Sequence, residues 1–254
     1  MPDALTCRAL TKRFGATLAV DALDLVVPTG SMFGLVGPNG AGKTTTLSMA
    51  TGLLRPDGGQ VLVDGGDVWA DLRRAHRLLG VLPDGLPTLD RLSGPELVEH
   101  TARLHGLPRA VAASRAADLL DVLDLATAGR TLVVDYSAGM RKKVGLACAL
   151  VHAPRVLVLD EPFEAVDPVS ATTIRELLRR FAADGGTVVV SSHVMALVEQ
   201  LCDHVGVIVS GRVVAAGTVA EVRGGGSLEE RFVALSGGTR GIGEGLTWLA
   251  SSSD

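Results

Sequence analysis

The sequence predicts an α/β protein: a mainly parallel sheet flanked by helices, with an antiparallel β part at its N-terminus and an inserted α-helical subdomain. Short, continuous apolar runs at 32–36, 155–159 and 187–192 are typical of buried parallel strands. Residues 4–27 instead indicate two strands joined by a polar connection. Across 93–152, apolar residues recur at helical spacing with almost no strand signal.

Composition limits the class of protein. The 254 residues are 47% hydrophobic and only 3% aromatic, which is enough for one large domain with an aliphatic core. The net charge of −4 gives no general attraction for nucleic acid. Cys7, Cys148 and Cys202 lie far apart in apolar segments, which suits a reducing compartment better than a disulfide framework or a metal site. With no signal-peptide pattern and no uncharged apolar run of ~18 residues, a cytoplasmic protein is expected.

The N-terminal β part has strands expected around Cys7 and over 18–27, with 11–17 as the connection between them. Phe14 lies in this connection. Its ring is expected either to anchor the core or to stack on a nucleobase, and the residue alone leaves both roles open.

The stretch 33–47, FGLVGPNGAGKTTTL, predicts a phosphate-binding loop between a buried strand and a helix. The motif G-x-x-x-x-G-K-[ST] is matched by Gly37, Gly42, Lys43 and Thr44. Glycines let the backbone turn tightly and point N–H groups at an anion, and the helix start adds the positive end of its dipole. Lys43 can bind the β- and γ-phosphates, and the Thr44 hydroxyl can ligate Mg²⁺. We therefore expect a nucleoside triphosphate here.

The next segment alternates between turns and short elements. A helix ends near Gly52, a short strand lies between two turns within 55–68, a helix covers 69–77, and a strand covers 79–82. The exit of that strand, Pro-Asp-Gly-Leu-Pro at 83–87, is a loop by composition. Three helices are then expected in the inserted subdomain, over 95–106, 111–125 and 140–151.

The start of the third of these helices is unusual. Ser137 can cap it, but Arg141, Lys142 and Lys143 crowd its first turns. Cations at a helix N-terminus oppose the helix dipole by a few tenths to ~1 kcal/mol each. An anion presented to this helix end would relieve the conflict, and a solvated basic face is the alternative; the sequence leaves both open.

The apolar run at 155–159 delivers two carboxylates at the carboxyl end of its strand, where α/β folds place their ligands. Asp160 is the expected Mg²⁺ partner of the phosphate loop. Glu161 can orient or deprotonate a water. The strand at 187–192 ends at His193, for which a catalytic and a structural role are both open.

The C-terminal part continues the α/β pattern. Helices are expected over 169–183 and 194–202, and a hairpin turns at 210–211. Helical signals follow at 219–222 and 228–234, before a Gly/Ser-rich tail. The predicted boundaries are a single domain over 1–235, with its core at about 1–84 and 154–235, a helical subdomain at about 85–153, and a disordered tail over 236–254.

These motifs, in this order, make residues 4–235 resemble the nucleotide-binding subunit of an ATP-binding cassette (ABC) transporter. GPNGAGKTT resembles the Walker A motif, and VLVLDE the Walker B motif with its catalytic glutamate. YSAGM stands in place of the LSGGQ signature, AVDP in place of the D-loop, and His193 in place of the switch histidine. The run SGRVVAAGTVAEV also resembles the family's hairpin after the switch histidine.

The resemblance implies ATP and Mg²⁺ as cofactors and assigns roles to individual residues. Catalysis would fall to Lys43, Glu161 and His193, and the metal to Thr44, Asp84 and Asp160. ATP would be bound by Phe14, Gly37, Pro38, Asn39, Gly40, Ala41, Gly42, Lys43, Thr44 and Thr45, and in trans by Ser137, Gly139 and Met140. This last contact would supply the anion at the Ser137 helix, because two cassettes of the family dimerise head-to-tail around two ATP molecules.

The resemblance also implies partners and a location. The expected partners are a separate transmembrane permease and a second cassette, in a homodimer or pseudo-homodimer. The protein would lie in the cytoplasm on the inner face of the cell membrane, held by the permease without inserting into lipid. No nucleic-acid partner is expected.

The sequence departs from the family pattern at two places. LSGGQ has become YSAGM, and the Q-loop glutamine is replaced by Asp84. Both changes resemble cassettes of bacterial exporters for antibiotics, polyketides or lipid-linked products, which implies export over import. Asp84 itself has two open roles, a Mg²⁺ ligand or a turn former in Pro-Asp-Gly.

Other classes of protein are less consistent with the sequence. A non-transport cassette acting on nucleic acid conflicts with the short helical insert and the acidic charge. A translation-associated cassette would place two cassettes in one chain. A GTPase or small-molecule kinase lacks support, because no N-K-x-D guanine motif is present.

Overall fold

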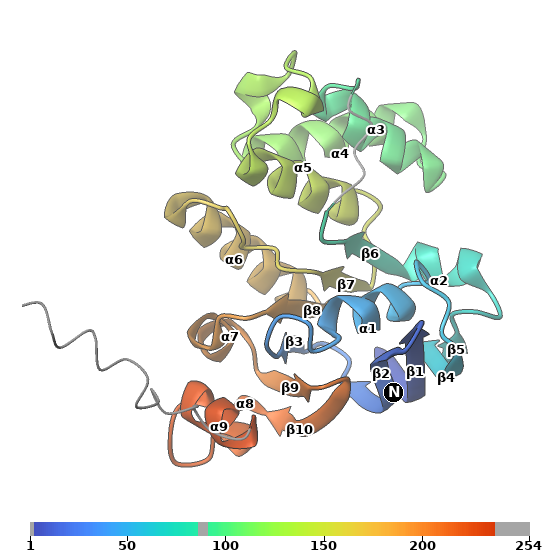
Figure 1. Ribbon diagram of the computed structural model, residues 1–254. Coiled ribbons are helices and arrows are strands. Elements are labelled where there is room, and N and C mark those ends of the chain that lie inside the picture. The colour runs from blue at the N-terminus through green and yellow to red at the C-terminus, as the bar shows by residue number, and fades with distance from the viewer. Residues whose placement is uncertain (1–2, 86–90, 237–254) are drawn as a thin grey trace, which may run out of the picture.

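The computed structural model describes residues 3–85 and 91–236 and contains two sheets and a set of helices (Figure 1). In this part of the chain the central sheet has the strand order β10-β9-β3-β8-β7-β6. All neighbours are parallel except β10, which pairs antiparallel with β9. The strands are β3 (Met32–Val36), β6 (Leu79–Leu82), β7 (Val156–Leu159), β8 (Thr187–Ser192), β9 (His204–Val209) and β10 (Arg212–Thr218).

Burial on both faces explains why these short apolar runs form the central sheet. Every residue of β3, β7 and β8 is buried. Along β3 the side chains alternate between two apolar clusters. Phe33 and Leu35 pack in the cluster shared with the N-terminal sheet and the helix α1 (Lys43–Ala50), while Met32 and Val36 pack in the cluster shared with the helices that follow β6 in the chain. The predicted mainly parallel sheet is confirmed.

The N-terminal sheet is antiparallel, with the order β2-β1-β4-β5. Its strands are β1 (Leu5–Phe14), β2 (Thr17–Val27), β4 (Gly58–Val63) and β5 (Gly66–Asp67). The polar connection predicted at 11–17 is wrong, because β1 continues to Phe14, which pairs with Thr17 across a turn at Gly15. Register shifts along β1 break the two-residue alternation on which the sequence pattern depends.

Helices cover the central sheet, and some of them connect its strands. They are α1 (Lys43–Ala50), α2 (Leu72–Leu78), α6 (Pro168–Ala183), α7 (Met195–Leu201), α8 (Val219–Arg223) and α9 (Leu228–Leu235). The start of α6 shows why such helices begin where they do. The Asp167 side chain accepts hydrogen bonds from the N–H groups of Val169 and Ser170, and Pro168 occupies the first helical position, where no N–H is needed.

A group of three helices lies between β6 and β7 in the chain and above that edge of the sheet in Figure 1. These are α3 (Gly94–Leu104), α4 (Arg109–Val122) and α5 (Ala138–Leu150), with short 3-10 turns at Ala126–Ala128 and Val133–Asp135. We call α3, α4 and α5 the helical subdomain. At the other end of the chain, the disorder predicted for 236–254 concerns residues that, from 237 on, lie outside the described range.

Two histidines stack where the helical subdomain meets the core. The rings of His105 and His152 lie 3.7 Å apart between centroids, with 12° between their planes. His152 Nε2 lies 3.0 Å from the carbonyl oxygen of Leu79 in β6, and since a carbonyl can only accept, Nε2 carries the proton. Burial, with the neighbouring His105, lowers the pKa of His152 from 6.5 to about 4, so its ring is neutral at pH 7.

Acid is therefore expected to destabilise the protein through His152. Its pKa is lower in the folded than in the unfolded chain, so the stabilisation is complete above pH 6.5 and is lost as the pH falls toward 4. The loss should be on the order of 1–2 kcal/mol after allowance for partial exposure to solvent. Urea unfolding of wild type and His152→Gln at pH 7.5 and 5 measures it. An equal loss of stability in both proteins would contradict this prediction.

Candidate functional site

The phosphate loop connects the end of β3 to the start of α1. Close approach of the backbone requires glycine at two of its positions. A Cβ on Gly37 would lie 2.4 Å from the carbonyl oxygen of Ile208. A Cβ on Gly42 would lie 2.5 Å from that of Ala19, and Gly42 also has a φ of +103°.

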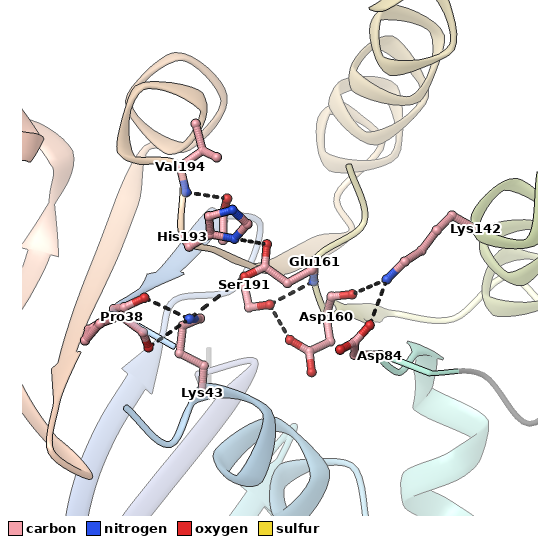
Figure 2. A network of polar contacts seen from close by, with 11 residues as sticks. Pro38, Lys43, Asp84, Lys142, Asp160, Glu161, Ser191, His193 and Val194 are labelled. Carbon is pink, nitrogen blue, oxygen red and sulfur yellow. Dashed lines mark hydrogen bonds and ion pairs between the residues drawn. The ribbon is translucent and has the colours of Figure 1, made fainter. Parts of the chain in front are cut away.

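The loop folds around the side chain of Lys43, which is 6% exposed. Its ammonium donates hydrogen bonds to the carbonyl oxygens of Gly37, at 2.8 Å, and of Pro38, at 3.3 Å (Figure 2). The lysine is thus held at the centre of its own loop, where a bound phosphate would meet it.

Asp160 and Glu161 follow directly after β7. Asp160 is 3% exposed, and one of its carboxylate oxygens accepts a hydrogen bond from the hydroxyl of Ser191 in β8 (Figure 2). Glu161 has a φ of +46°, in the left-handed region that side chains other than glycine rarely adopt. Its backbone N–H donates to Ser191 Oγ at 2.9 Å.

The Glu161 carboxylate lies between two other groups of the predicted site. His193 Nδ1 is 3.1 Å from Glu161 Oε2, and Lys43 Nζ is 3.9 Å from Glu161 Oε1 (Figure 2). The three side chains come from the phosphate loop, the end of β7 and the end of β8, three neighbouring strands whose carboxyl ends share one edge of the sheet. The structure thus brings the three expected catalytic residues together.

A cleft of about 470 Å³ opens above these groups. It holds most of the residues that the sequence singled out: Phe14, Pro38, Asn39, Gly40, Ala41, Gly42, Lys43, Thr44, Thr45, Asp84, Glu161 and His193. The Phe14 ring is 51% exposed at its wall, so a role as a core anchor is wrong. A ring in this position can stack on a flat ligand.

Asp84 lies on the wall of the cleft and pairs with a lysine. Lys142 Nζ in α5 is 3.3 Å from Asp84 Oδ1 and donates a hydrogen bond at 3.2 Å to the carbonyl oxygen of Asp160 (Figure 2). The Lys142 side chain is 15% exposed and that of Asp84 49%. Neither Lys142 nor Ser191 was expected from the sequence to belong to the site. For Ser191 a signal existed, since a serine near the end of a buried apolar strand needs a polar partner.

The helix that begins after Ser137 is α5, and Ser137 caps it by accepting the N–H of Met140 at 3.2 Å. The cations in its first turns have partners within the chain. Lys143 is 7% exposed and contacts the carbonyl of Asp124, and the Arg141 guanidinium donates to the carbonyls of Tyr136 and Val134. A solvated basic face is therefore wrong for Lys142 and Lys143.

Comparison with known proteins decides the family. A family model described as ABC transporter matches residues 20–164 of this chain. The daunorubicin resistance ATP-binding protein DrrA3 of Streptomyces coeruleorubidus is 38% identical over 220 residues, which cover 87% of this chain and 70% of that protein. This chain belongs to the ABC transporter family. A second relative, the Nod factor export ATP-binding protein I of Burkholderia orbicola, is 38% identical over 83% of this chain and 69% of that protein.

A solved structure agrees with this assignment. The ATP-binding subunit of an ABC transporter matches with a TM-score of 0.86 at 29% identity, over 92% of this chain and 99% of that one. The chain is thus an ATP-binding subunit of the ABC family with ATPase activity, and the resemblance noted in the sequence is confirmed. Within the residues that the structure describes, no helix combines the length and the apolar character needed to cross a bilayer.

Several of the expected ABC site residues do not line the cleft of their own chain. The signature residues Ser137, Gly139 and Met140 are described by the structure but do not line it. Gly139 instead lies against the loop after Glu161, where a Cβ would be 2.9 Å from the carbonyl oxygen of Ala165. Gly37 and Asp160 are buried and also lie outside the lining.

The oxygen donors present suit Mg²⁺. In the described residues, no three or more His, Cys, Asp or Glu side chains form a metal-binding group of their own. Mg²⁺ in nucleotide sites is held by one or two protein oxygens together with substrate phosphates. Thr44, which carries a hydroxyl, and Asp84 both line the cleft, and the Asp160 carboxylate is buried directly before Glu161 in the chain. The donor set therefore fits the ion when a triphosphate is bound.

Proposed function

We propose that this ABC subunit powers export through a separate membrane-spanning partner, using ATP bound in the cleft above Lys43. The main support for the site is that Lys43 and His193 both lie within 3.9 Å of the Glu161 carboxylate. The names of the relatives support the direction of transport, since they describe drug resistance and Nod factor export. Association with the inner face of the membrane follows from the partner.

In the proposed mechanism, the loop and Lys43 bind the phosphates. The Lys43 ammonium now bonds two loop carbonyls, and phosphate oxygens would take over part of its donor capacity. The backbone N–H groups of the loop and the start of α1 add positive potential without moving. The Phe14 ring at the cleft wall would stack on the adenine.

Glu161 is proposed to orient the attacking water and accept its proton. His193 holds one carboxylate oxygen of Glu161, which fixes the direction of the other. Thr44, Asp160 and Asp84 would hold Mg²⁺, which when bound neutralises charge on the phosphates. Because Asp160 is tied to Ser191, its carboxylate is fixed before any ligand arrives.

We further propose that a second copy completes the site. Ser137, Gly139 and Met140 do not line their own cleft, and α5 presents a capped helix N-terminus. In the family, this end meets the γ-phosphate held by the partner's Walker A loop. A head-to-tail dimer would therefore bind two ATP molecules, each between the loop of one copy and the signature helix of the other.

The transport role is tested by coexpression with any membrane protein that the genome encodes beside this chain. The proposal expects the two to purify together from membranes and ATP turnover in the complex to respond to the exported compound. The complex with Glu161→Gln is the control and should bind without turnover. A chain that stays out of the membrane fraction, with turnover unaffected by any membrane protein encoded beside it, would contradict the transport role.

Replacing Asp84 tests its proposed part in the metal site. Asp84→Ala is expected to raise the Mg²⁺ concentration for half-maximal hydrolysis by about tenfold, and Asp84→Asn by less, because the amide keeps an oxygen. Mg²⁺ is titrated at saturating ATP. If both variants keep the wild-type midpoint, Asp84 does not hold the metal. A lower maximal rate with an unchanged Mg²⁺ midpoint would instead show that Asp84 acts through the Lys142 side chain, with which it pairs.

A further inference from the structure

One peptide group in the site is held at both of its polar atoms. It joins Asp160 to Glu161. Its N–H donates to Ser191 Oγ at 2.9 Å, and its carbonyl oxygen accepts from Lys142 Nζ at 3.2 Å (Figure 2). The first contact comes from β8 in the core, and the second from α5 in the helical subdomain.

This peptide sets the direction of the Glu161 side chain. The φ of Glu161 is +46°, in the left-handed region that a residue with a Cβ rarely adopts and that persists only where the surroundings enforce it. Ser191 is fully buried and contributes twice, since its hydroxyl accepts from the Glu161 N–H and donates to the Asp160 carboxylate. One hydroxyl therefore aligns both acidic residues.

The Lys142 side chain links three parts of the fold through its ammonium group. It pairs with Asp84 at the exit of β6, bonds the Asp160 carbonyl at the end of β7, and is itself part of α5. The Asp84 carboxylate is half exposed, so the ion pair alone contributes little stability. Lys142 does not line the cleft in the described residues, so it does not reach a ligand there directly. Its bond to the carbonyl is what connects the helical subdomain to Glu161.

We propose that Ser191 and Lys142 are positioning residues that hold the Asp160–Glu161 peptide, and that Lys142 couples the placement of the helical subdomain to the Glu161 carboxylate. The inference rests on the proposed role of Glu161 in hydrolysis. A shift of α5 away from the core would break the carbonyl bond, and the peptide would then keep only its contact with Ser191. ATP binding would persist, because Lys43 and its loop are held independently.

Separate measurements of kcat and ATP affinity test the proposal. Ser191→Ala and Lys142→Ala are expected to lower kcat by about tenfold or more, while the Kd for ATP stays within about threefold of wild type. Ser191→Thr and Lys142→Arg keep the donors and should restore most of the rate. Arg155→Ala is the matched control, because it removes a cation from an exposed ion pair at the opposite end of β7. It should match wild type.

A double-mutant cycle tests whether the two residues act on the same peptide. The Ser191→Ala, Lys142→Ala double variant is expected to be little slower than the slower single variant, because the peptide keeps its direction only while both of its polar atoms are held. Rate losses that multiply would mean independent roles and would overturn the shared mechanism. Thermal unfolding of each variant distinguishes a misfolded protein from a folded protein with a misplaced Glu161 peptide. If Ser191→Ala does not fold, Lys142→Ala, which changes a residue near the surface, still tests the proposal.

The Glu161→Gln variant distinguishes failure of this inference from failure of the proposed function. If Glu161→Gln is inactive while the Ser191 and Lys142 variants turn over like wild type, the positioning role is wrong and the proposed site stands. If Glu161→Gln keeps its turnover, the proposed function of the site itself is wrong. A fall in ATP affinity equal to the fall in kcat for Lys142→Ala would also overturn the inference, because it would place Lys142 in binding.

Discussion

A Glu161→Gln variant is expected to bind ATP with nearly wild-type affinity and to hydrolyse it at least about a hundredfold more slowly. The carboxylate lies 3.1 Å from His193 Nδ1 and 3.9 Å from Lys43 Nζ, in the lining of the cleft. An amide of the same size keeps the shape of the site and can hold a water, but it cannot accept a proton. Phosphate release and the binding of a fluorescent ATP analogue measure the two effects.

The control for this variant is Glu176→Gln, which removes an exposed carboxylate on α6. It should bind and hydrolyse ATP like wild type. Turnover by Glu161→Gln within about twofold of wild type would remove Glu161 from the reaction. Loss of ATP binding together with turnover would show that the carboxylate is needed to form the site.

Lys43→Ala is expected to reduce hydrolysis by about a thousandfold or more and to weaken ATP binding, with the fold intact. The hydrogen bonds of its ammonium stay within the loop, at the Gly37 and Pro38 carbonyls, so no contact between the sheets depends on it. Its remaining partner is Glu161. Phosphate release measures the loss, and circular dichroism with thermal unfolding checks the fold.

Lys43→Arg serves as the second variant at this position. A guanidinium keeps the charge but is a planar fork, so it does not replace a compact ammonium held by two carbonyls. It should remain far below wild type. Retained turnover in Lys43→Ala would contradict the assignment of the phosphate site.

The parts of the fold that sequence predicts well are those where burial alone decides the structure. β3, β6 and β8 have the bounds that the sequence predicts, and β3 and β8 are buried along their whole length. The end of β1 was not predicted, since polar residues occupy 11–13 and the register shifts along the strand hide its two-residue alternation. The two-residue strand β5 carries too few residues to show any period.

Some residues of the site could also be predicted from the sequence, and others could not. Glu161 and His193 could be placed because both follow buried strands, and parallel strands end at one edge of the sheet. Lys142 could not, because its contacts with Asp84 and the Asp160 carbonyl join segments far apart in the chain. Spacing alone does not show which way a long side chain turns.

The same limit applies to the cations at the start of α5. Their conflict with the helix dipole is visible in the sequence, but its resolution is tertiary. Lys142 and Lys143 bend toward carbonyl, hydroxyl and carboxylate groups of other elements, so they do not need a bound anion to be stable. The proposed contact of Ser137 with ATP therefore depends on a second copy of the chain and not on these charges.

Two copies of the chain are proposed to close around ATP, and the molar mass of Glu161→Gln in solution shows whether they do. Light scattering coupled to gel filtration is run with ATP and Mg²⁺, with ADP, and without nucleotide. We expect twice the 26.2 kDa chain mass with ATP and Mg²⁺ and a single chain mass with ADP or without nucleotide, and we expect Ser137→Arg in the same background to prevent dimer formation. A protein that stays at 26.2 kDa at saturating ATP and Mg²⁺ would contradict the two-copy site.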